Sequence, residues 1–279
     1  MNNDNKLTIS AILLDMDGTF FLGESLLPGA LELLDFLNEK GLRFSFLTNN
    51  SSKNRSAYVE KLTKLGVRQE DARIYTAGDA TIAYLKQHFD GKRIGLLGTK
   101  SLRASFLEAG LPVVEEEPQV MVMGYDTEMT YAELVRFCLQ LQKGLPFVAT
   151  HPDINCPSPL GPLPDIGAFF ALIELSTGRK PDVVIGKPNR GIVDALTQNW
   201  GLRNEEILMV GDRLYTDIAL GSTAGVQTCL VLSGESKLAD IPGSQYQPDF
   251  VCENLAGLLV LFRERGAVDR KQEIGNGKQ

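Results

Sequence analysis

The sequence predicts an α/β fold in which a parallel sheet is covered by helices on both faces. Short apolar runs of strand length alternate with amphipathic stretches of helix length, and this rhythm occurs twice, near residues 9–65 and near 183–232. The composition, 43% hydrophobic and 23% charged, is typical of a folded globular protein. Ligands of parallel sheets bind beyond the carboxyl ends of the strands, so a functional site is expected there.

The individual elements follow from the periodicity and from helix stop signals such as Gly66 and Gly201. The first stretch predicts, in order, a strand at 9–14, a helix at 29–40, a strand at 43–48 and a helix at 55–65. The second predicts a strand at 183–185, a helix at 189–200, a strand at 207–210, a helix at 216–224 and a strand at 228–232. Both belong to one Rossmann-like core with helices on either side of its sheet.

A middle block has strands and helices of its own. Its apolar runs predict strands at 93–97, 120–123 and 146–150, and the segments that flank it, 76–79 and 176–181, have the glycine and proline content of linkers. We therefore predict two domains, a core of residues 1–79 and 179–279 and an inserted α/β domain of residues 80–178.

Composition excludes several classes of function. The net charge is −7 and no run of Lys or Arg forms a basic stripe, so binding to a nucleic acid polymer is not expected. The first ten residues lack the pattern of a signal peptide and no apolar run reaches membrane-spanning length, which predicts a cytoplasmic protein without a membrane partner. Four scattered cysteines and two histidines make thiolate or imidazole metal sites improbable.

Acidic residues follow two of the predicted strands. Asp15 and Asp17 come directly after the first strand, and Asp212 and Asp217 follow the strand at 207–210. Carboxylates at the mouth of a buried strand repel one another and lose hydration, so a fold keeps them where a cation or a reaction uses them. The alternative for the first pair is an ordinary strand that stops at a polar turn.

Two further polar positions follow predicted strands. Thr48 and Asn49 begin a run of hydroxyl and amide side chains that either caps a helix or holds an oxyanion, and Lys187 follows the strand at 183–185 between a glycine and a proline. A lone lysine is usually a solvated surface charge. Considered jointly, the strand ends supply oxygen ligands and one cation, which favours Mg²⁺ and phosphoryl transfer.

Four motifs in this order resemble those of the haloacid dehalogenase superfamily of phosphohydrolases. They are Asp15-Met-Asp-Gly-Thr19, Thr48-Asn-Asn, Gly186-Lys187-Pro188 and Gly211-Asp212-Arg-Leu-Tyr-Thr-Asp217. Within the superfamily the chain is similar to the NagD and p-nitrophenyl phosphatase group, which carries a large α/β cap between the second and third motifs. The resemblance covers residues 8 to 255 and implies a core with three αβα layers and a cap that closes over small substrates.

The resemblance also implies the role of each motif residue. Asp15 attacks phosphorus to give an aspartyl-phosphate, and Asp17 protonates the leaving alcohol and then activates water. Mg²⁺ is held by Asp15, the backbone carbonyl of Asp17 and Asp212, with Asp217 orienting the metal shell from outside. The phosphoryl oxygens are bound by Thr48, Lys187 and Asn49.

In the predicted cap, residues 149–153 resemble the family's substrate-specificity segment, although Asn is more usual where this chain has His151. The resemblance places His151 and Asp153 there as candidate substrate-binding residues. It implies small phosphate esters as substrates, such as sugar phosphates, nucleoside monophosphates or p-nitrophenyl phosphate, and is compatible with a homodimer formed through the cap.

Three other functions are compatible with parts of the pattern. A mutase of the same fold would transfer the phosphoryl group to a second sugar instead of to water. A phospho-signalling receiver also combines strand-end acids with Thr and Lys, but receivers are about half as long and have no inserted cap. A non-catalytic metabolite sensor would not need every catalytic position to be filled, as it is here.

Overall fold

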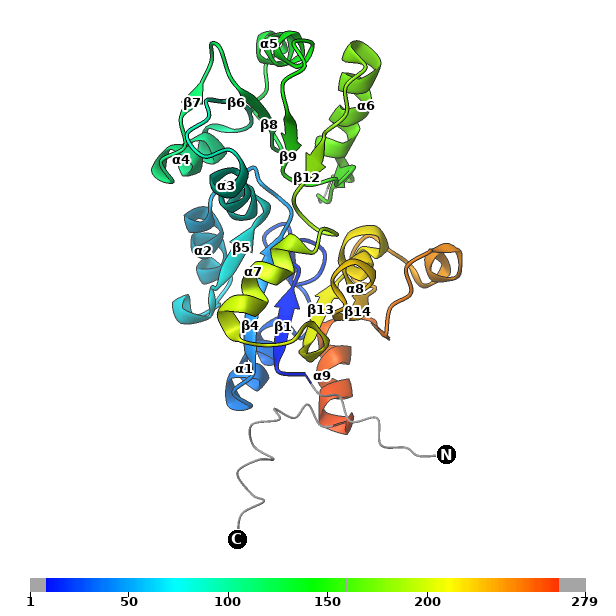
Figure 1. Ribbon diagram of the computed structural model, residues 1–279. Coiled ribbons are helices and arrows are strands. Elements are labelled where there is room, and N and C mark those ends of the chain that lie inside the picture. The colour runs from blue at the N-terminus through cyan, green and yellow to red at the C-terminus, as the bar shows by residue number, and fades with distance from the viewer. Residues whose placement is uncertain (1–8, 159, 266–279) are drawn as a thin grey trace. The chain divides into compact units, whose positions relative to one another are not determined.

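The computed structural model describes residues 9–158 and 160–265 (Figure 1). The described residues form two compact units. The first contains those up to Leu47, Lys61–Arg73 and those from Val193 on, and the second contains Thr48–Glu60 and Ile74–Ile192. The predicted boundaries of core and cap, at residues 79/80 and 178/179, stay a prediction.

The first unit is built on parallel strands. Strands β1 (Ala11–Leu14), β4 (Arg43–Thr48), β13 (Ile207–Gly211), β14 (Gln227–Val231) and β15 (Phe250–Cys252) lie in the order β15-β14-β13-β1-β4. All the registered pairs among them are parallel. Every residue of β1 and β13 is buried, as expected for central strands whose two faces are both covered. A short hairpin, β2 (Phe21–Leu22) and β3 (Ser25–Leu26), follows β1.

Helices cover this sheet because each presents one apolar stripe. Helix α1 (Ala30–Glu39) buries residues at helical spacing, Leu33 and Leu37 among them, and packs against α9 (Leu255–Arg265), where the Phe36 and Phe262 rings stack 6.0 Å apart. The other helical segments are α8 (Ala219–Ala224), η1 (Gln69–Asp71), η2 (Asn204–Glu206), the π-helical η3 (Leu214–Ile218) and η4 (Leu238–Gly243). Helices α2 (Arg55–Lys64) and α7 (Gly191–Trp200) each pass from one unit into the other.

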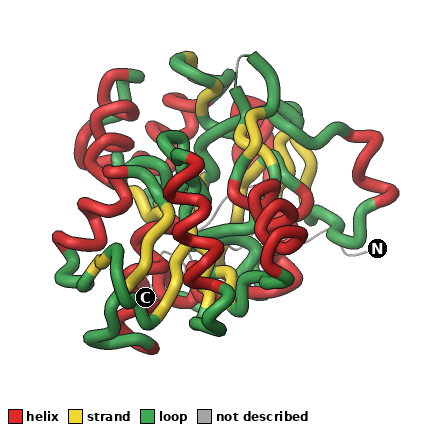
Figure 2. Tube along the Cα trace, turned by 90° about the horizontal axis from the view of Figure 1, so that it is seen from above, coloured by secondary structure: helices red, strands yellow, loops and turns green. Residues whose placement is uncertain are grey.

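The second unit has a parallel sheet of its own. Its strands β6 (Ile94–Leu97), β7 (Val113–Val114), β8 (Val120–Met123), β9 (Phe147–Ala149) and β12 (Val183–Val184) lie in the order β12-β9-β8-β6-β7. Its helices are α3 (Ala77–His88), α4 (Lys100–Glu108), α5 (Tyr131–Leu141) and α6 (Ile166–Thr177), and its remaining strands are β5 (Ile74–Thr76), β10 (Asn155–Cys156) and β11 (Leu163–Pro164). Helices flank the strands in both units (Figure 2), which confirms the predicted α/β class.

Side chains from α5, α6 and the strands between them form the core of the second unit. Phe137 of α5 meets Phe147 of β9 edge to face, with ring centroids 5.5 Å apart, and Ile166 and Ile173 of α6 join the same cluster. Capping boxes begin α3 at Thr76 and α5 at Thr130. These caps fix where two of the helices start.

One strand lies in a different sheet from the one its position in the rhythm predicts. The strand at 183–185 was expected to open the second half of the core, but Val183 and Val184 pair with Val148 and Ala149 of β9 in the second unit. So short an apolar run carries no information about which strand it will pair with. The prediction grouped this strand with the core strands that follow it only because it is near them in the sequence.

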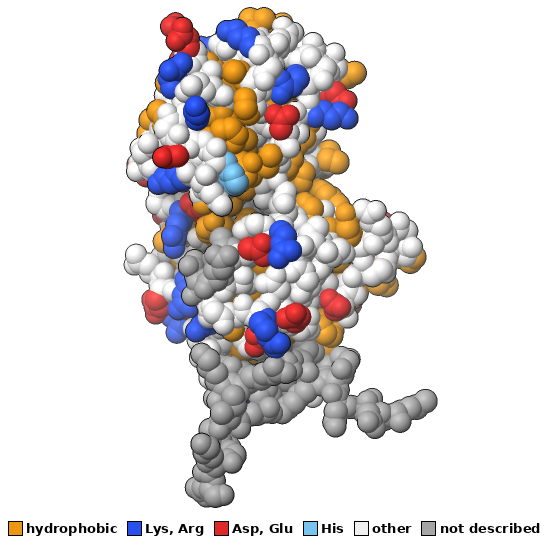
Figure 3. Space-filling model, viewed as in Figure 1, with side chains coloured by type: hydrophobic (Ala, Val, Ile, Leu, Met, Phe, Trp, Pro, Cys, Tyr) orange, Lys and Arg blue, Asp and Glu red, His pale blue; other side chains and the backbone are white. Residues whose placement is uncertain are grey.

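The surface carries both charge signs. On the face drawn in Figure 3, Lys and Arg side chains are interspersed with Asp and Glu side chains. Within the described residues, no helix has both the length and the apolar character needed to cross a membrane.

Candidate active site

Three buried carboxylates come together in the first unit. Single ligand atoms of Asp15, Asp212 and Asp217 all lie within 4.8 Å of one another, and these residues are 8%, 0% and 0% exposed. Asp15 directly follows β1 and Asp212 directly follows β13, and these neighbouring parallel strands end at the same edge of the sheet. The backbone N–H of Asp15 donates to the Val210 carbonyl at 2.9 Å, which continues the pairing as far as the acids.

Glycines allow the backbone to approach these carboxylates closely. A Cβ atom on Gly18 would lie 2.6 Å from Asp212 Oδ2, and one on Gly211 would lie 2.2 Å from Asp217 Cγ. Gly18 also has a φ of +89°, a conformation that side-chain-bearing residues rarely adopt. Any larger residue in place of the glycines of the Asp-Gly-Thr and Gly-Asp motifs would therefore clash with the acids.

The donor set fits a hard divalent cation. Carboxylate oxygens are the ligands that Mg²⁺ prefers, and three carboxylates this close, all buried, repel one another unless positive charge offsets them. The Asp212 carboxylate accepts hydrogen bonds from Thr19 Oγ1 at 3.2 Å and from the Glu235 backbone N–H at 2.7 Å. Asp15, Asp212 and Asp217 could therefore hold a metal ion.

Asp17 is only partly buried and is not a member of this cluster. It lies in a tight turn in which the N–H groups of Thr19, Phe20 and Phe21 all approach the Met16 carbonyl. The turn starts at Met16, two residues after the end of β1. Asp17 is therefore more exposed than Asp15, although only one residue separates them in the sequence. The different surroundings of the two acids suit the different roles predicted for them.

The segment Ser233–Ser236 after β14 contacts the acidic cluster, although none of its residues is among the predicted site residues. Ser233 Oγ donates to the Gly18 carbonyl at 2.9 Å, and the Ser236 N–H donates to the Asp212 carbonyl at 3.1 Å. Glu235 also forms an ion pair with Arg213 at 3.0 Å. The signal that could have found the segment is its position, because it follows a predicted strand of the same sheet.

We expect Gly234→Ala to destabilise the protein by about 1–3 kcal/mol. A Cβ at this position would lie 2.0 Å from Asp212 Oδ2, and Asp212 cannot move aside without losing its bonds to Thr19 and Glu235. Urea unfolding measures the change. Gly243→Ala is the matched control, because a Cβ on Gly243 meets no atom within 4 Å, and equal losses in the two variants would contradict the prediction.

The second unit brings together other residues that the sequence singled out. The Asn49 amide donates to Asp153 Oδ1 at 2.7 Å and to the Lys187 carbonyl at 3.0 Å, while its oxygen accepts from the Lys187 backbone N–H at 2.8 Å. Lys187 is 2% exposed. Thr48 is the last residue of β4, and its hydroxyl oxygen accepts from the Asn50 N–H at 3.1 Å. Asn49 thus fixes the backbone of Lys187 and the side chain of Asp153 at the same time.

His151 is completely buried in the second unit, and both of its ring nitrogens have partners there. Nδ1 lies 2.8 Å from Thr150 Oγ1 and Nε2 lies 3.0 Å from Asp165 Oδ1. Ligand atoms of His151, Asp153 and Asp165 lie within 4.8 Å of one another, but each takes part in the hydrogen bonds just described. Hydrogen bonding accounts for this second group without a metal ion.

The predicted site residues thus form two groups, one in each unit. Their catalytic, metal-binding and substrate-binding roles stay a prediction. The first unit holds Asp15, Asp17, Asp212 and Asp217, and the second holds Thr48, Asn49, His151, Asp153 and Lys187.

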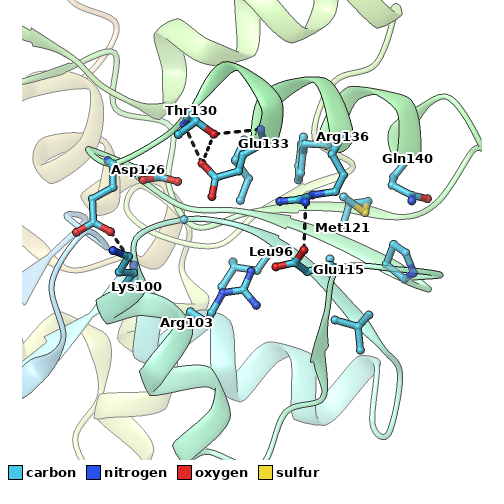
Figure 4. Close-up of a pocket in the computed structure, with 17 residues that line it drawn as sticks. Leu96, Lys100, Arg103, Glu115, Met121, Asp126, Thr130, Glu133, Arg136 and Gln140 are labelled. Carbon is cyan, nitrogen blue, oxygen red and sulfur yellow. Dashed lines mark hydrogen bonds and ion pairs between the residues drawn. The ribbon is translucent and has the colours of Figure 1, made fainter.

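A cavity of about 230 Å³ lies elsewhere in the second unit, between α4 and α5 (Figure 4). Charged side chains of both helices line it, including Arg103 and Arg136, and Arg136 forms an ion pair with Glu115 at 3.1 Å. Burial raises the pKa of Asp126 at its rim. None of the predicted site residues lines this cavity.

Comparison with known proteins gives consistent matches over most of the chain. Residues 12–112 match the model of the haloacid dehalogenase-like hydrolases, and residues 184–258 match a second model of HAD-like hydrolases. The chain is 33% identical over 246 residues to an acid sugar phosphatase of Staphylococcus aureus, a match that covers 88% of this chain and 95% of the relative.

Two solved structures extend the similarity to the fold. The 4-nitrophenylphosphatase of Thermotoga maritima matches with a TM-score of 0.85 and 48% identity over 90% of this chain and 96% of its own. The glycerol phosphate phosphatase of Mycobacterium tuberculosis, solved in complex with magnesium, matches with a TM-score of 0.80 and 28% identity over 90% of this chain and 76% of its own.

Proposed function

The chain belongs to the haloacid dehalogenase-like hydrolases and is a phosphatase, and we propose that it hydrolyses small phosphate monoesters with Mg²⁺ through an aspartyl-phosphate intermediate. The resemblance to NagD and p-nitrophenyl phosphatases is confirmed by these matches. The observation that carries the proposal is the buried cluster of Asp15, Asp212 and Asp217 at the ends of neighbouring strands.

In the proposed reaction, the two acids after β1 have different roles. An Asp15 oxygen attacks the phosphorus, the bond to the leaving oxygen breaks, and Asp17 gives that oxygen its proton. Asp17 then takes a proton from water as the water attacks the aspartyl-phosphate, which releases inorganic phosphate and restores Asp15. The greater exposure of Asp17 supports its role as the group that exchanges protons.

Asp15, the Asp17 backbone carbonyl and Asp212 would hold Mg²⁺, with Asp217 orienting the shell from outside. When bound, Mg²⁺ supplies positive charge that offsets the carboxylates and the incoming phosphate. The magnesium complex of the similar glycerol phosphate phosphatase supports this choice of ion. In the proposal, Thr48, Asn49 and Lys187 bind phosphoryl oxygens. The hydrogen bonds from Asn49 hold the backbone of Lys187, which carries the positively charged side chain.

The proposed substrates are sugar phosphates, nucleoside monophosphates and p-nitrophenyl phosphate. The names of the similar proteins, an acid sugar phosphatase and a 4-nitrophenylphosphatase, support this class. Asp153 is the candidate for recognising the leaving group, since its side chain is tied through Asn49 to the Lys187 backbone. A cytoplasmic location, a homodimer through the cap and the absence of nucleic acid or membrane partners stay predictions.

We expect purified protein with Mg²⁺ to release inorganic phosphate from several esters of a broad panel that includes sugar phosphates and nucleoside monophosphates. The measurement is phosphate release with water as the only acceptor, repeated with a second sugar added. A rate that requires the added sugar would identify a mutase. A stable phosphorylated protein that does not turn over would instead identify a signalling module.

A further inference from the structure

The second unit contains a buried chain of hydrogen bonds that runs from the segment after β4 to the start of α6. Ser51 Oγ lies 3.0 Å from Thr150 Oγ1, Thr150 Oγ1 lies 2.8 Å from His151 Nδ1, and His151 Nε2 lies 3.0 Å from Asp165 Oδ1. The first three residues are 0% exposed and Asp165 is 2% exposed. Ser51, Thr150 and Asp165 have no part in the proposed reaction.

The hydrogen-bond roles are fixed at the two ends of this series, at Asp165 and at the Tyr125 backbone N–H. The Asp165 carboxylate can only accept, so His151 donates a hydrogen from Nε2, and its Nδ1 shares a hydrogen bond with the Thr150 hydroxyl. The Thr150 and Ser51 hydroxyls share the next hydrogen bond. Ser51 Oγ accepts from the backbone N–H of Tyr125 at 2.9 Å. Each hydroxyl group and each ring nitrogen in this series therefore has a hydrogen-bond partner.

The first residues of α6 also hold the backbone of the segment 150–154. The Asp165 N–H donates to the Ile154 carbonyl at 2.9 Å, and the Gly167 N–H donates to the Asp153 carbonyl at 2.8 Å. Gly167 allows this approach, because a Cβ there would lie 2.4 Å from the Pro152 carbonyl oxygen. Asp165 thus contacts the segment through its side chain and through its backbone.

Residues of the proposed site join the two ends of this chain of hydrogen bonds, so that the contacts form a ring. Asn49, two residues before Ser51, binds the Asp153 side chain at 2.7 Å and the Lys187 backbone N–H at 2.8 Å. The backbone at Gly186 lies against the same ring, since a Cβ there would be 2.5 Å from Asn49 Oδ1 and 2.9 Å from His151 Cβ. Two side-chain bonds therefore join segment 49–51 to segment 150–153.

We propose that Asp165 and Thr150 are positioning residues that act through His151 to set where Asp153 lies, and so control which phosphate esters the enzyme prefers. The proposal rests on the proposed function, in which Lys187 binds the phosphoryl group and Asp153 recognises the leaving group. His151 acts through the segment that carries it, because its side chain is fully buried and both nitrogens are engaged. Removing a hydrogen bond from this series loosens segment 150–153 and changes leaving-group recognition.

The test compares Thr150→Val with Thr150→Ser. Valine keeps the shape of threonine but leaves His151 Nδ1 without its hydrogen-bond partner, whereas serine keeps the hydroxyl. Steady-state kinetics with a sugar phosphate and with p-nitrophenyl phosphate gives the ratio of their kcat/KM values. We expect Thr150→Val to change this ratio by about tenfold, mainly through KM, and Thr150→Ser to restore it to within about twofold. Asp165→Ala should behave as Thr150→Val does, and Asp165→Asn, which keeps an accepting oxygen, as wild type.

Thr81→Val is the matched control, because Thr81 has a buried hydroxyl in the same unit that bonds only locally, to the Ala77 carbonyl at 2.7 Å. It should leave the ratio unchanged. The proposal is overturned if Thr150→Val and Asp165→Ala slow both esters equally, or if Thr81→Val shifts the ratio as much. If circular dichroism shows that Thr150→Val does not fold, Ser51→Ala cuts the chain at its other end and decides by the same ratio. Wild-type protein inactive on every ester would instead refute the proposed function.

Discussion

Asp15→Asn should lower the rate of phosphate release by a factor on the order of 10⁴ or more, because an amide cannot act as the nucleophile. The substitution keeps the size of the side chain and removes one of three buried carboxylates that lie within 4.8 Å of one another. Without metal, the variant should therefore melt at a temperature at least as high as that of wild type. Steady-state phosphate release and thermal unfolding in EDTA measure the two effects.

The matched control is Asp71→Asn, which removes another buried carboxylate of the first unit, bonded to Asn38 and Arg68. It should lower stability and leave turnover intact. In wild type, acid quenching during turnover should trap one phosphoryl group on the peptide that contains Asp15, detected by mass spectrometry. Undiminished activity in Asp15→Asn, or a phosphoryl group on another residue, would refute the covalent mechanism.

The strands that carry the site could be predicted because their signals are local. The strand at 43–48 was predicted at the bounds that β4 has, and the buried runs before Asp15 and Asp212 read as continuous apolar stretches. Two parallel strands that each end in an acid place those acids at one edge of the sheet. The meeting of Asp15 with Asp212 follows from this rule, given that β1 and β13 are neighbours.

The remaining contacts of the predicted site residues join residues that are far apart in the sequence, and no local sequence pattern predicts such contacts. The partners of His151 could not be inferred, because Asp165 is fourteen residues away and Ser51, at the other end of the same chain of hydrogen bonds, is 100 residues earlier. Glu235 likewise donates to Asp212 from its backbone N–H, a group that every residue except proline carries. Backbone donors and distant polar partners hold both groups of predicted site residues without leaving a motif in the sequence.

Asp212→Asn should remove most of the affinity for Mg²⁺, by about 100-fold or more, and most of the phosphatase activity with it. Coulomb's law gives about 3 kcal/mol of repulsion for each pair of carboxylates about 5 Å apart at an effective dielectric of about 20. The metal-free variant should therefore be more stable than metal-free wild type. Saturating Mg²⁺ should raise the melting temperature of wild type and leave that of the variant nearly unchanged.

Asp217→Asn is the informative comparison, because Asp217 is predicted to orient the metal shell from outside and also accepts the Arg213 N–H at 3.1 Å. It should weaken Mg²⁺ binding less than Asp212→Asn does, and magnesium titrations followed by thermal unfolding give the order directly. A greater loss in Asp217→Asn would exchange the roles of the two acids. Phosphatase activity that survives exhaustive EDTA treatment of wild type would remove the metal from the mechanism, since the buried carboxylates would then act without a cation.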